Sequence, residues 1–66
     1  MVGERIKSLR LEKNLSQETL AQKIQSNQKQ ISKWERNKIE PNIDALSRLA
    51  DYFEVSVDYL IGRADY

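Results

Sequence analysis

Residues 16–37, SQETLAQKIQSNQKQISKWERN, decide the fold of this chain, because they contain the signals for two short helices and a tight turn. Ser16 belongs to the residue types that are favoured at helix N-caps. Behind it, Leu20 and Ile24 repeat at helical spacing and predict a helix over about 17–24.

A second helix follows after a turn of about three residues. Asn27 is again of an N-cap type, and Ile31 with Trp34 gives the apolar spacing of a helix that runs to about Arg36. Two helices joined by so short a turn lie at about 90–120° to each other. We therefore expect the second helix to protrude.

The second helix is predicted to have one polar side. At about 100° per residue its polar donors fall within about 140° of each other, and Ile31 and Trp34 fall opposite. These donors are Gln28, Lys29, Ser32, Lys33 and Arg36. Glutamine can bond adenine, lysine can bond guanine and serine can bond either, so this side suits the base edges of a DNA major groove. The alternatives are a solvated surface without a role and, for Trp34, stacking on bases instead of packing in the core.

Three further helices are predicted outside this stretch. Apolar residues from Val2 to Leu11 favour a helix over about 2–13, which ends at Asn14. Asn42 is expected to cap the most amphipathic helix, with apolar positions at Ile43, Leu46, Leu49, Ala50 and Phe53. Ser56 is expected to cap a last short helix with Val57, Leu60 and Ile61, which ends at Gly62.

The fold class expected from these elements is all-α: one compact five-helix domain over residues 1–66, with a helix-turn-helix formed by its second and third helices. No segment alternates at period two for long enough to predict a strand. A chain of 66 residues without cysteine must rely on well-packed helices.

Composition argues against several classes of function. The chain has no histidine, no cysteine and only two glycines, so we expect no catalytic residues, no metal site and no cofactor. No small-molecule ligand is evident. There is no apolar run of the roughly 18 residues that a membrane span needs, and no apolar signal core. We expect a cytoplasmic protein, which the absence of thiols fits.

The charges are divided between the two halves of the chain. Residues 1–38 carry nine lysines and arginines against four acidic residues, whereas residues 39–66 carry two against six. The net charge is only +1. One basic half is expected if one face meets a polyanion such as DNA, although ordinary unevenness of a charged surface would give the same pattern.

The sequence resembles the lambda-repressor-like (Cro/CI, XRE-type) helix-turn-helix family. The resemblance lies in Leu20-Ala21-Gln-Lys-Ile24 followed by Ile31-Ser-Lys-Trp-Glu-Arg36, and in residues 51–62, DYFEVSVDYLIG, which are similar to the last two helices of the family. It covers nearly the whole chain. It implies a five-helix fold and sequence-specific binding of double-stranded DNA, usually as a homodimer on a palindromic operator.

The resemblance also implies roles for individual positions. The base-reading positions are Gln28, Lys29, Ser32 and Lys33. The positions expected to contact phosphates are Gln17, Asn27, Asn37 and Lys38, joined by Arg36 unless that residue is only a solvated charge. Arg10 and Glu35 are expected to form an ion pair that ties the recognition helix to the body. The alternative for Arg10 is a phosphate contact.

The turn departs from the family pattern, which has glycine and then an apolar residue where this chain has Gln25 and Ser26. Gln25 would have to adopt a positive φ, at a cost of roughly 1–2 kcal/mol. We expect the motif to survive with a looser or altered turn.

The function predicted from the sequence is that of a transcriptional regulator, a repressor in the first instance, which reads DNA with the helix over about 28–36. The alternative is a protein-interaction module, such as an antitoxin-like or assembly domain on the same fold. An apolar protein contact would respond little to salt, whereas DNA binding through several phosphates would weaken steeply as salt rises.

Overall fold

The computed structural model describes residues 2–65, which form five α-helices and no strand. They are α1 (Val2–Glu12), α2 (Gln17–Lys23), α3 (Gln28–Glu35), α4 (Ile43–Phe53) and α5 (Val57–Leu60). All five predicted helices are therefore confirmed. The first three end one residue earlier than predicted, a difference within the usual uncertainty of helix ends.

Four helices begin at a side chain that caps them. Ser16, Asn27, Asn42 and Ser56 each accept a hydrogen bond from the backbone N–H three residues further on, at 2.8–3.0 Å. Each bond satisfies one of the N–H groups that a helix leaves unpaired at its start. The sequence predictions of these four helix starts are confirmed.

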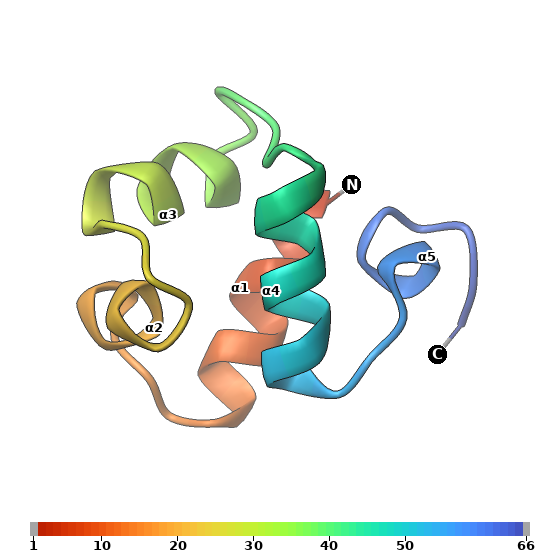
Figure 1. Ribbon diagram of the computed structural model, residues 1–66, viewed down its shortest axis with the longest axis horizontal. Coiled ribbons are helices and arrows are strands. Elements are labelled where there is room, and N and C mark those ends of the chain that lie inside the picture. Colours follow the sequence, from red (N-terminus) through yellow and green to blue (C-terminus); the bar gives the residue numbers. More distant parts are fainter. Residues whose placement is uncertain (1, 66) are drawn as a thin grey trace.

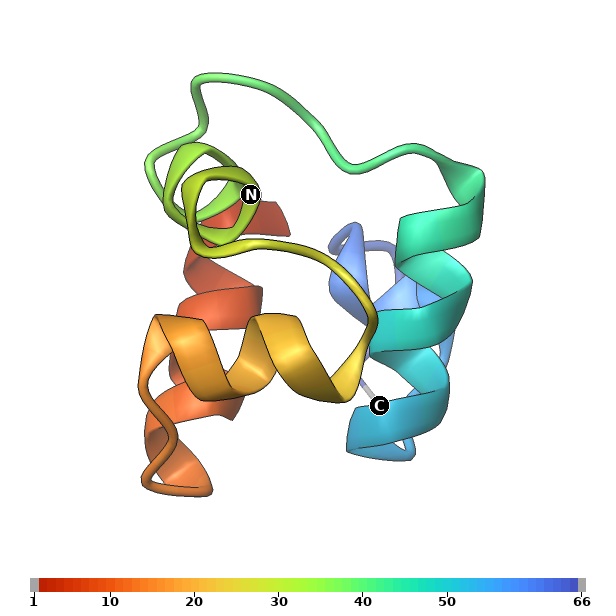
Figure 2. The same cartoon turned by 60° about the vertical axis from the view of Figure 1, so that its left-hand side comes forward.

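The helices surround a single core to which each contributes one fully buried side chain. These side chains are Ile6, Leu20, Ile31, Leu49 and Leu60. In Figure 1, α2 and α3 lie on one side of α4, and α5 lies on the other. Figure 2 shows α2 crossing in front of α1, with its end directed toward α4. This packing holds α2 and α3 against the body and leaves the outer side of α3 uncovered.

Three apolar residues predicted to face the core are exposed instead. Ile43 is 82% exposed, Leu11 is 52% exposed and Ile61 is 40% exposed. Each stands at the end of its helix: Leu11 in the last turn of α1, Ile43 at the start of α4 and Ile61 directly after α5. Helical spacing assigns a residue to a side of its helix, but it does not say how far along the helix that side is covered.

The turn between α2 and α3 keeps a regular form although it lacks glycine. Gln25 has a φ of 60°, as predicted, and the N–H of Ser26 donates to the carbonyl of Ala21 at 2.8 Å. This pair of features is typical of a helix C-terminus that ends in a left-handed residue. The motif thus survives without glycine, as expected, and the turn is closed by this hydrogen bond.

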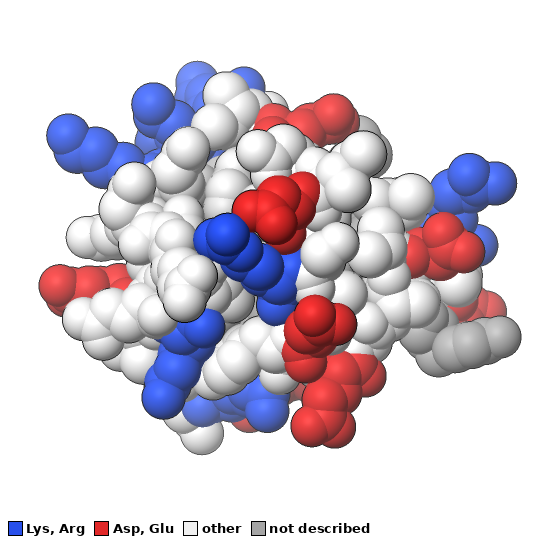
Figure 3. Space-filling model, in the orientation of Figure 1, with Lys and Arg blue, Asp and Glu red and all other residues white. Residues whose placement is uncertain are grey.

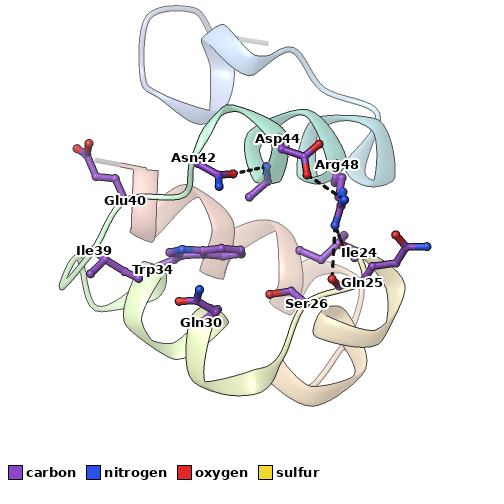
Figure 4. Close-up of a pocket in the computed structure, with 11 residues that line it drawn as sticks. Ile24, Gln25, Ser26, Gln30, Trp34, Ile39, Glu40, Asn42, Asp44 and Arg48 are labelled. Atoms are coloured by element: carbon purple, nitrogen blue, oxygen red, sulfur yellow. Dashed lines mark hydrogen bonds and ion pairs between the residues drawn. The ribbon is translucent and has the colours of Figure 1, made fainter.

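Arg48 of α4 supports this turn from the side. Its Nη1 donates to the carbonyl oxygens of Ile24 and Gln25, at 3.3 and 3.4 Å, and its Nη2 pairs with Asp44 at 2.9 Å (Figure 4). A cation beside the last carbonyls of a helix satisfies acceptors that have no partner within the helix. Arg48 thereby links α4 to the helix-turn-helix.

Two features are absent from residues 2–65, a membrane-spanning helix and a cluster of metal ligands. No helix there is long and apolar enough to cross a membrane. The same residues contain no group of three or more carboxylate, imidazole or thiol side chains arranged to hold a metal ion.

Candidate nucleic-acid interface

The outer side of α3 displays the predicted base-reading residues together. Gln28, Lys29 and Lys33 are exposed and Ser32 is half-buried. With Arg36 they surround a shallow hollow of about 260 Å³, in which the short Ser32 is flanked by four longer side chains. Hydrogen-bond donors and acceptors therefore converge on one exposed surface, which we call the α3 face.

The back of α3 is buried. Ile31 is fully buried, and Trp34 is 4% exposed. A ring so enclosed has no face free for a base, so Trp34 is a core residue. The alternative in which it stacks on nucleic acid is excluded by its burial.

Basic and acidic side chains gather on different parts of the surface. In Figure 3 several lysines and arginines project over α3 and the loop that follows it, while acidic side chains gather over α4 and beside α5. Basic groups on and beside an exposed helix raise the local concentration of a polyanion. The electrostatic character of the α3 face thus differs from that of the opposite half.

Arg10 and Glu35 form a buried ion pair between α1 and α3. The guanidinium donates from Nε to Oε2 at 2.6 Å and from Nη2 to Oε1 at 3.0 Å, and Nη1 donates to the carbonyl of Leu15 at 2.7 Å. Three of the five N–H groups of Arg10 are engaged inside the protein, and the residue is buried, 9% exposed. This arrangement ties α3 to the body, and the burial argues against a phosphate contact by Arg10.

Gln17, a predicted phosphate contact, lies between the ion pair and the α3 face. It is half-buried, and its Nε2 donates to Oε1 of Glu35 at 3.1 Å. Its Oε1 accepts from Nε2 of Gln28 at 3.5 Å. Spacing along the chain did not reveal this contact, because residues 17, 28 and 35 come from two helices that only the turn brings together.

The other predicted phosphate contacts flank α3 along the chain. Asn27, Arg36 and Lys38 are exposed. Asn27 uses its Oδ1 to cap α3, and Arg36 donates from Nε to the carbonyl of Ser32 at 3.4 Å. Their contacts with DNA remain predictions.

Asn37 has a structural role that its predicted phosphate contact did not include. Its φ is 59°, and its Oδ1 accepts from the N–H of Gly3 at 3.2 Å. Its Nδ2 donates to Glu4 at 3.1 Å, and this hydrogen bond lowers the pKa of the Glu4 carboxyl. The side chain is thus directed at the start of α1, which no local sequence signal indicated.

Gly3 permits that close approach. A Cβ at position 3 would collide with the carbonyl oxygen of Trp34 and lie 2.6 Å from Oδ1 of Asn37. The start of α1 is therefore packed directly against the end of α3. This contact fixes the direction in which the α3 face points.

Comparison with known proteins identifies the family. The helix-turn-helix family matches residues 6–60. The chain is 40% identical over 59 residues to the HTH-type transcriptional activator BcrR of Enterococcus faecalis, covering 89% of this chain and 29% of that protein. It is 34% identical over 61 residues to Repressor protein C2 of Salmonella phage P22, covering 92% of this chain and 28% of that protein. The chain thus spans less than a third of the length of either relative.

Solved structures give the same result. The P22 c2 repressor in complex with a synthetic operator superposes with a TM-score of 0.91 at 33% identity, over 97% of both chains. The N-terminal DNA-binding domain of SinR from Bacillus subtilis superposes with a TM-score of 0.86 at 37% identity, over 92% of this chain and 90% of that one. The chain therefore belongs to the helix-turn-helix family, in its lambda-repressor-like (Cro/CI, XRE-type) branch.

Proposed function

We propose that this chain is the sequence-specific, double-stranded DNA-binding domain of a transcriptional regulator, and that it acts as a repressor. The observation that carries the proposal is the α3 face, which presents amide, hydroxyl and ammonium groups on the outside of a helix whose back is buried. A helix of this kind fits the major groove, where each base pair has its own order of donors and acceptors.

The proposed contacts with DNA are divided between two sets of residues. Gln28, Lys29, Ser32 and Lys33 contact base edges in this proposal. Phosphate contacts come from Gln17, Asn27, Arg36, Asn37 and Lys38, and they fix the position of the domain without reading sequence. Gln17 and Asn37 each use part of their amide inside the protein, so each has one amide hydrogen left for a phosphate.

The names of two relatives support a role in transcriptional regulation. One is called a transcriptional activator and the other a repressor, and the P22 c2 repressor was solved in complex with an operator. The chain belongs to a family of helix-turn-helix domains and not to an enzyme family. A regulator that binds operators works in the cytoplasm, where we place this protein. We also propose that residues 1–66 form a single domain.

Two copies are proposed to bind a palindromic operator. Half-sites on one face of DNA are about 34 Å apart, and the chain measures 27 × 23 × 19 Å, so neighbouring copies would meet over a small area. Ile39 lies in the loop that follows α3 and Ile43 at the end of that loop, and they are 41% and 82% exposed. We propose that these apolar side chains meet those of the second copy.

A selection of bound sequences from random DNA duplexes tests the proposal. We expect a motif with two-fold symmetry to be enriched. Gln28→Ala should then lose about 1–3 kcal/mol of discrimination at one base position and little elsewhere. Equal loss of affinity for all sequences would contradict base reading by Gln28.

The protein-interaction module is the competing function, and a salt series separates the two. Affinity for the selected duplex should fall steeply between about 50 and 200 mM salt, because bound phosphates have released counterions. Selection of no sequence, together with salt-insensitive binding to a protein partner, would favour the competing function.

A further inference from the structure

The side chain of Asn37 caps the start of α1, although Asn37 and Gly3 lie 34 residues apart in the chain. Its Oδ1 accepts from the N–H of Gly3 at 3.2 Å, and this N–H is one of those that a helix leaves unpaired in its first turn. Its Nδ2 donates to Oε1 of Glu4 at 3.1 Å. A helix cap normally acts on the residues that directly follow it. Here the cap of α1 comes from the end of α3.

Asn37 is also the residue at which the chain leaves α3. Its φ is 59°, and the hydrogen bond from the N–H of Lys38 to the carbonyl of Lys33 closes the helix end around it. Gly3 lets the two helices meet here, because a Cβ at this position would lie 2.6 Å from Oδ1 of Asn37 and 2.9 Å from the carbonyl oxygen of Glu35. One amide group therefore joins the start of α1 to the end of α3.

The loop over residues 38–41 has few other attachments. Within residues 2–65, the N–H of Lys38 is the only group of this loop that takes part in a hydrogen bond. Ile39 and Glu40 line a hollow of about 230 Å³, and Glu40 and Pro41 line a second one of about 130 Å³. Atoms beside a hollow lack packing partners on that side. The position of Lys38 therefore depends on the anchor at Asn37.

We propose that Asn37 is a positioning residue, which anchors the loop after α3 to α1 and thereby holds the ammonium group of Lys38 where it reaches a DNA phosphate. The inference rests on the proposed function, in which Lys38 contacts phosphate, and it gives Asn37 a role besides a phosphate contact of its own. The two roles of Asn37 differ in their response to salt. An ammonium group that neutralises a phosphate releases a counterion, whereas an uncharged amide does not.

Asn37→Gly removes the amide and keeps the backbone conformation, because glycine adopts a positive φ without strain. Affinities for the selected operator and for an unrelated duplex are measured at several salt concentrations. We expect the salt slope to fall by about one unit on both duplexes, because Lys38 contacts no base in the proposed function. Circular dichroism shows that the variant is folded.

Asn14→Gly is the matched control. Asn14 also has a positive φ, of 58°, at the end of a helix, and it is exposed. Unlike Asn37, it makes no side-chain hydrogen bond to any other residue of the part of the chain that the structure describes. The salt slope of Asn14→Gly should equal that of the wild type.

The same replacement in Lys38→Ala tests whether the effect passes through Lys38. Without the ammonium group, no charge at this position is left to misplace. We expect Asn37→Gly to leave the salt slope of Lys38→Ala unchanged. A further fall of about one unit would show that Asn37 acts on another charge, and it would overturn the inference.

Glu4 tests the anchor from the side of α1. Glu4→Gln and Glu4→Ala remove the same negative charge, but only glutamine keeps an oxygen that can accept from Nδ2 of Asn37. The difference between the two variants therefore reports the contact and not the charge. We expect a lower salt slope for Glu4→Ala than for Glu4→Gln, and equal slopes would exclude Glu4 from the anchor.

The outcomes separate this inference from the proposed function. If Asn37→Gly weakens binding but keeps the wild-type slope, Asn37 is only a phosphate contact or a structural residue, and the inference is overturned while DNA reading stands. If the wild-type protein selects no sequence and binds no duplex in a salt-dependent manner, both proposals fall.

Discussion

Lys38 is an exposed residue whose place is set by the end of α3. Its backbone N–H donates to the carbonyl of Lys33 at 2.9 Å, directly after the left-handed residue Asn37. This geometry ends α3 and turns the chain, and the Lys38 side chain is exposed. At the scale of one residue, Lys38 offers a positive charge to a phosphate.

Lys38→Ala is therefore predicted to weaken binding to all DNA sequences alike and to reduce the salt slope by about one unit. The measurement is a set of binding isotherms at several salt concentrations. Lys23→Ala, an exposed lysine at the end of α2 beside Tyr52, is the control and should keep the slope. An unchanged slope in Lys38→Ala would remove this residue from the phosphate contacts.

The buried pair of Arg10 and Glu35 is predicted to be costly to break from one side. Arg10→Met leaves an unpaired buried carboxylate and should lower the free energy of unfolding by about 3–5 kcal/mol, as measured by urea denaturation. Asp44→Ala removes an exposed carboxylate from Arg48 and should cost less than about 1 kcal/mol. Similar losses in both variants would mean that the pair of Arg10 and Glu35 has the weak energetics of a surface ion pair.

Among the elements, the turn between α2 and α3 is held by contacts from outside it. Gln25 has a positive φ, and Arg48 of α4 bonds the carbonyls at the end of α2. A residue with a side chain is strained in this conformation. The contacts from Arg48 thus add to the local hydrogen bond between Ser26 and Ala21 in holding the turn.

Gln25→Gly is predicted to raise the free energy of unfolding by about 1 kcal/mol, because glycine adopts a positive φ without strain. The same replacement at Gln22, inside α2, should lower it by about 1 kcal/mol. Thermal or urea unfolding of both variants checks the opposite signs. A destabilised Gln25→Gly would show that its side chain, and not the strain, dominates at the turn.

On the scale of the whole molecule, two features bear on how two copies of the chain would bind one operator. They are the exposed apolar residues and the spacing of the DNA half-sites. Ile43 and Leu11 are both exposed apolar residues, at 82% and 52%, but they stand at the ends of different helices. Only Ile43 adjoins the loop that follows α3. This difference makes Leu11 a matched control for a contact between copies.

Ile43→Ser is predicted to reduce cooperative binding to a two-half-site operator by several-fold and to leave affinity for one half-site unchanged. Leu11→Ser should change neither quantity. Insertion of about five base pairs between the half-sites, half a helical turn, should abolish cooperativity in the wild-type protein. Cooperativity that survives both Ile43→Ser and the insertion would exclude the proposed contact.

The sequence predicted those features whose physical cause is local. The caps at Ser16, Asn27 and Asn42 act within three residues of themselves, and helical spacing placed Ile31 and Trp34 on the buried side of α3. The family pattern supplied the partner of Arg10. These signals were sufficient for five helices and for the side of α3 that faces outward.

The tertiary structure decided what depends on neighbours distant in the sequence. Packing brought Gln17 between Glu35 and Gln28, directed Asn37 at the start of α1 and left Ile43 uncovered. Helical periodicity describes one helix at a time, whereas hydrogen bonds between side chains and the coverage of a helix end depend on where a second element lies. The elements and the outward face were therefore predictable from the chain alone, and the contacts that link that face to the rest of the protein were not.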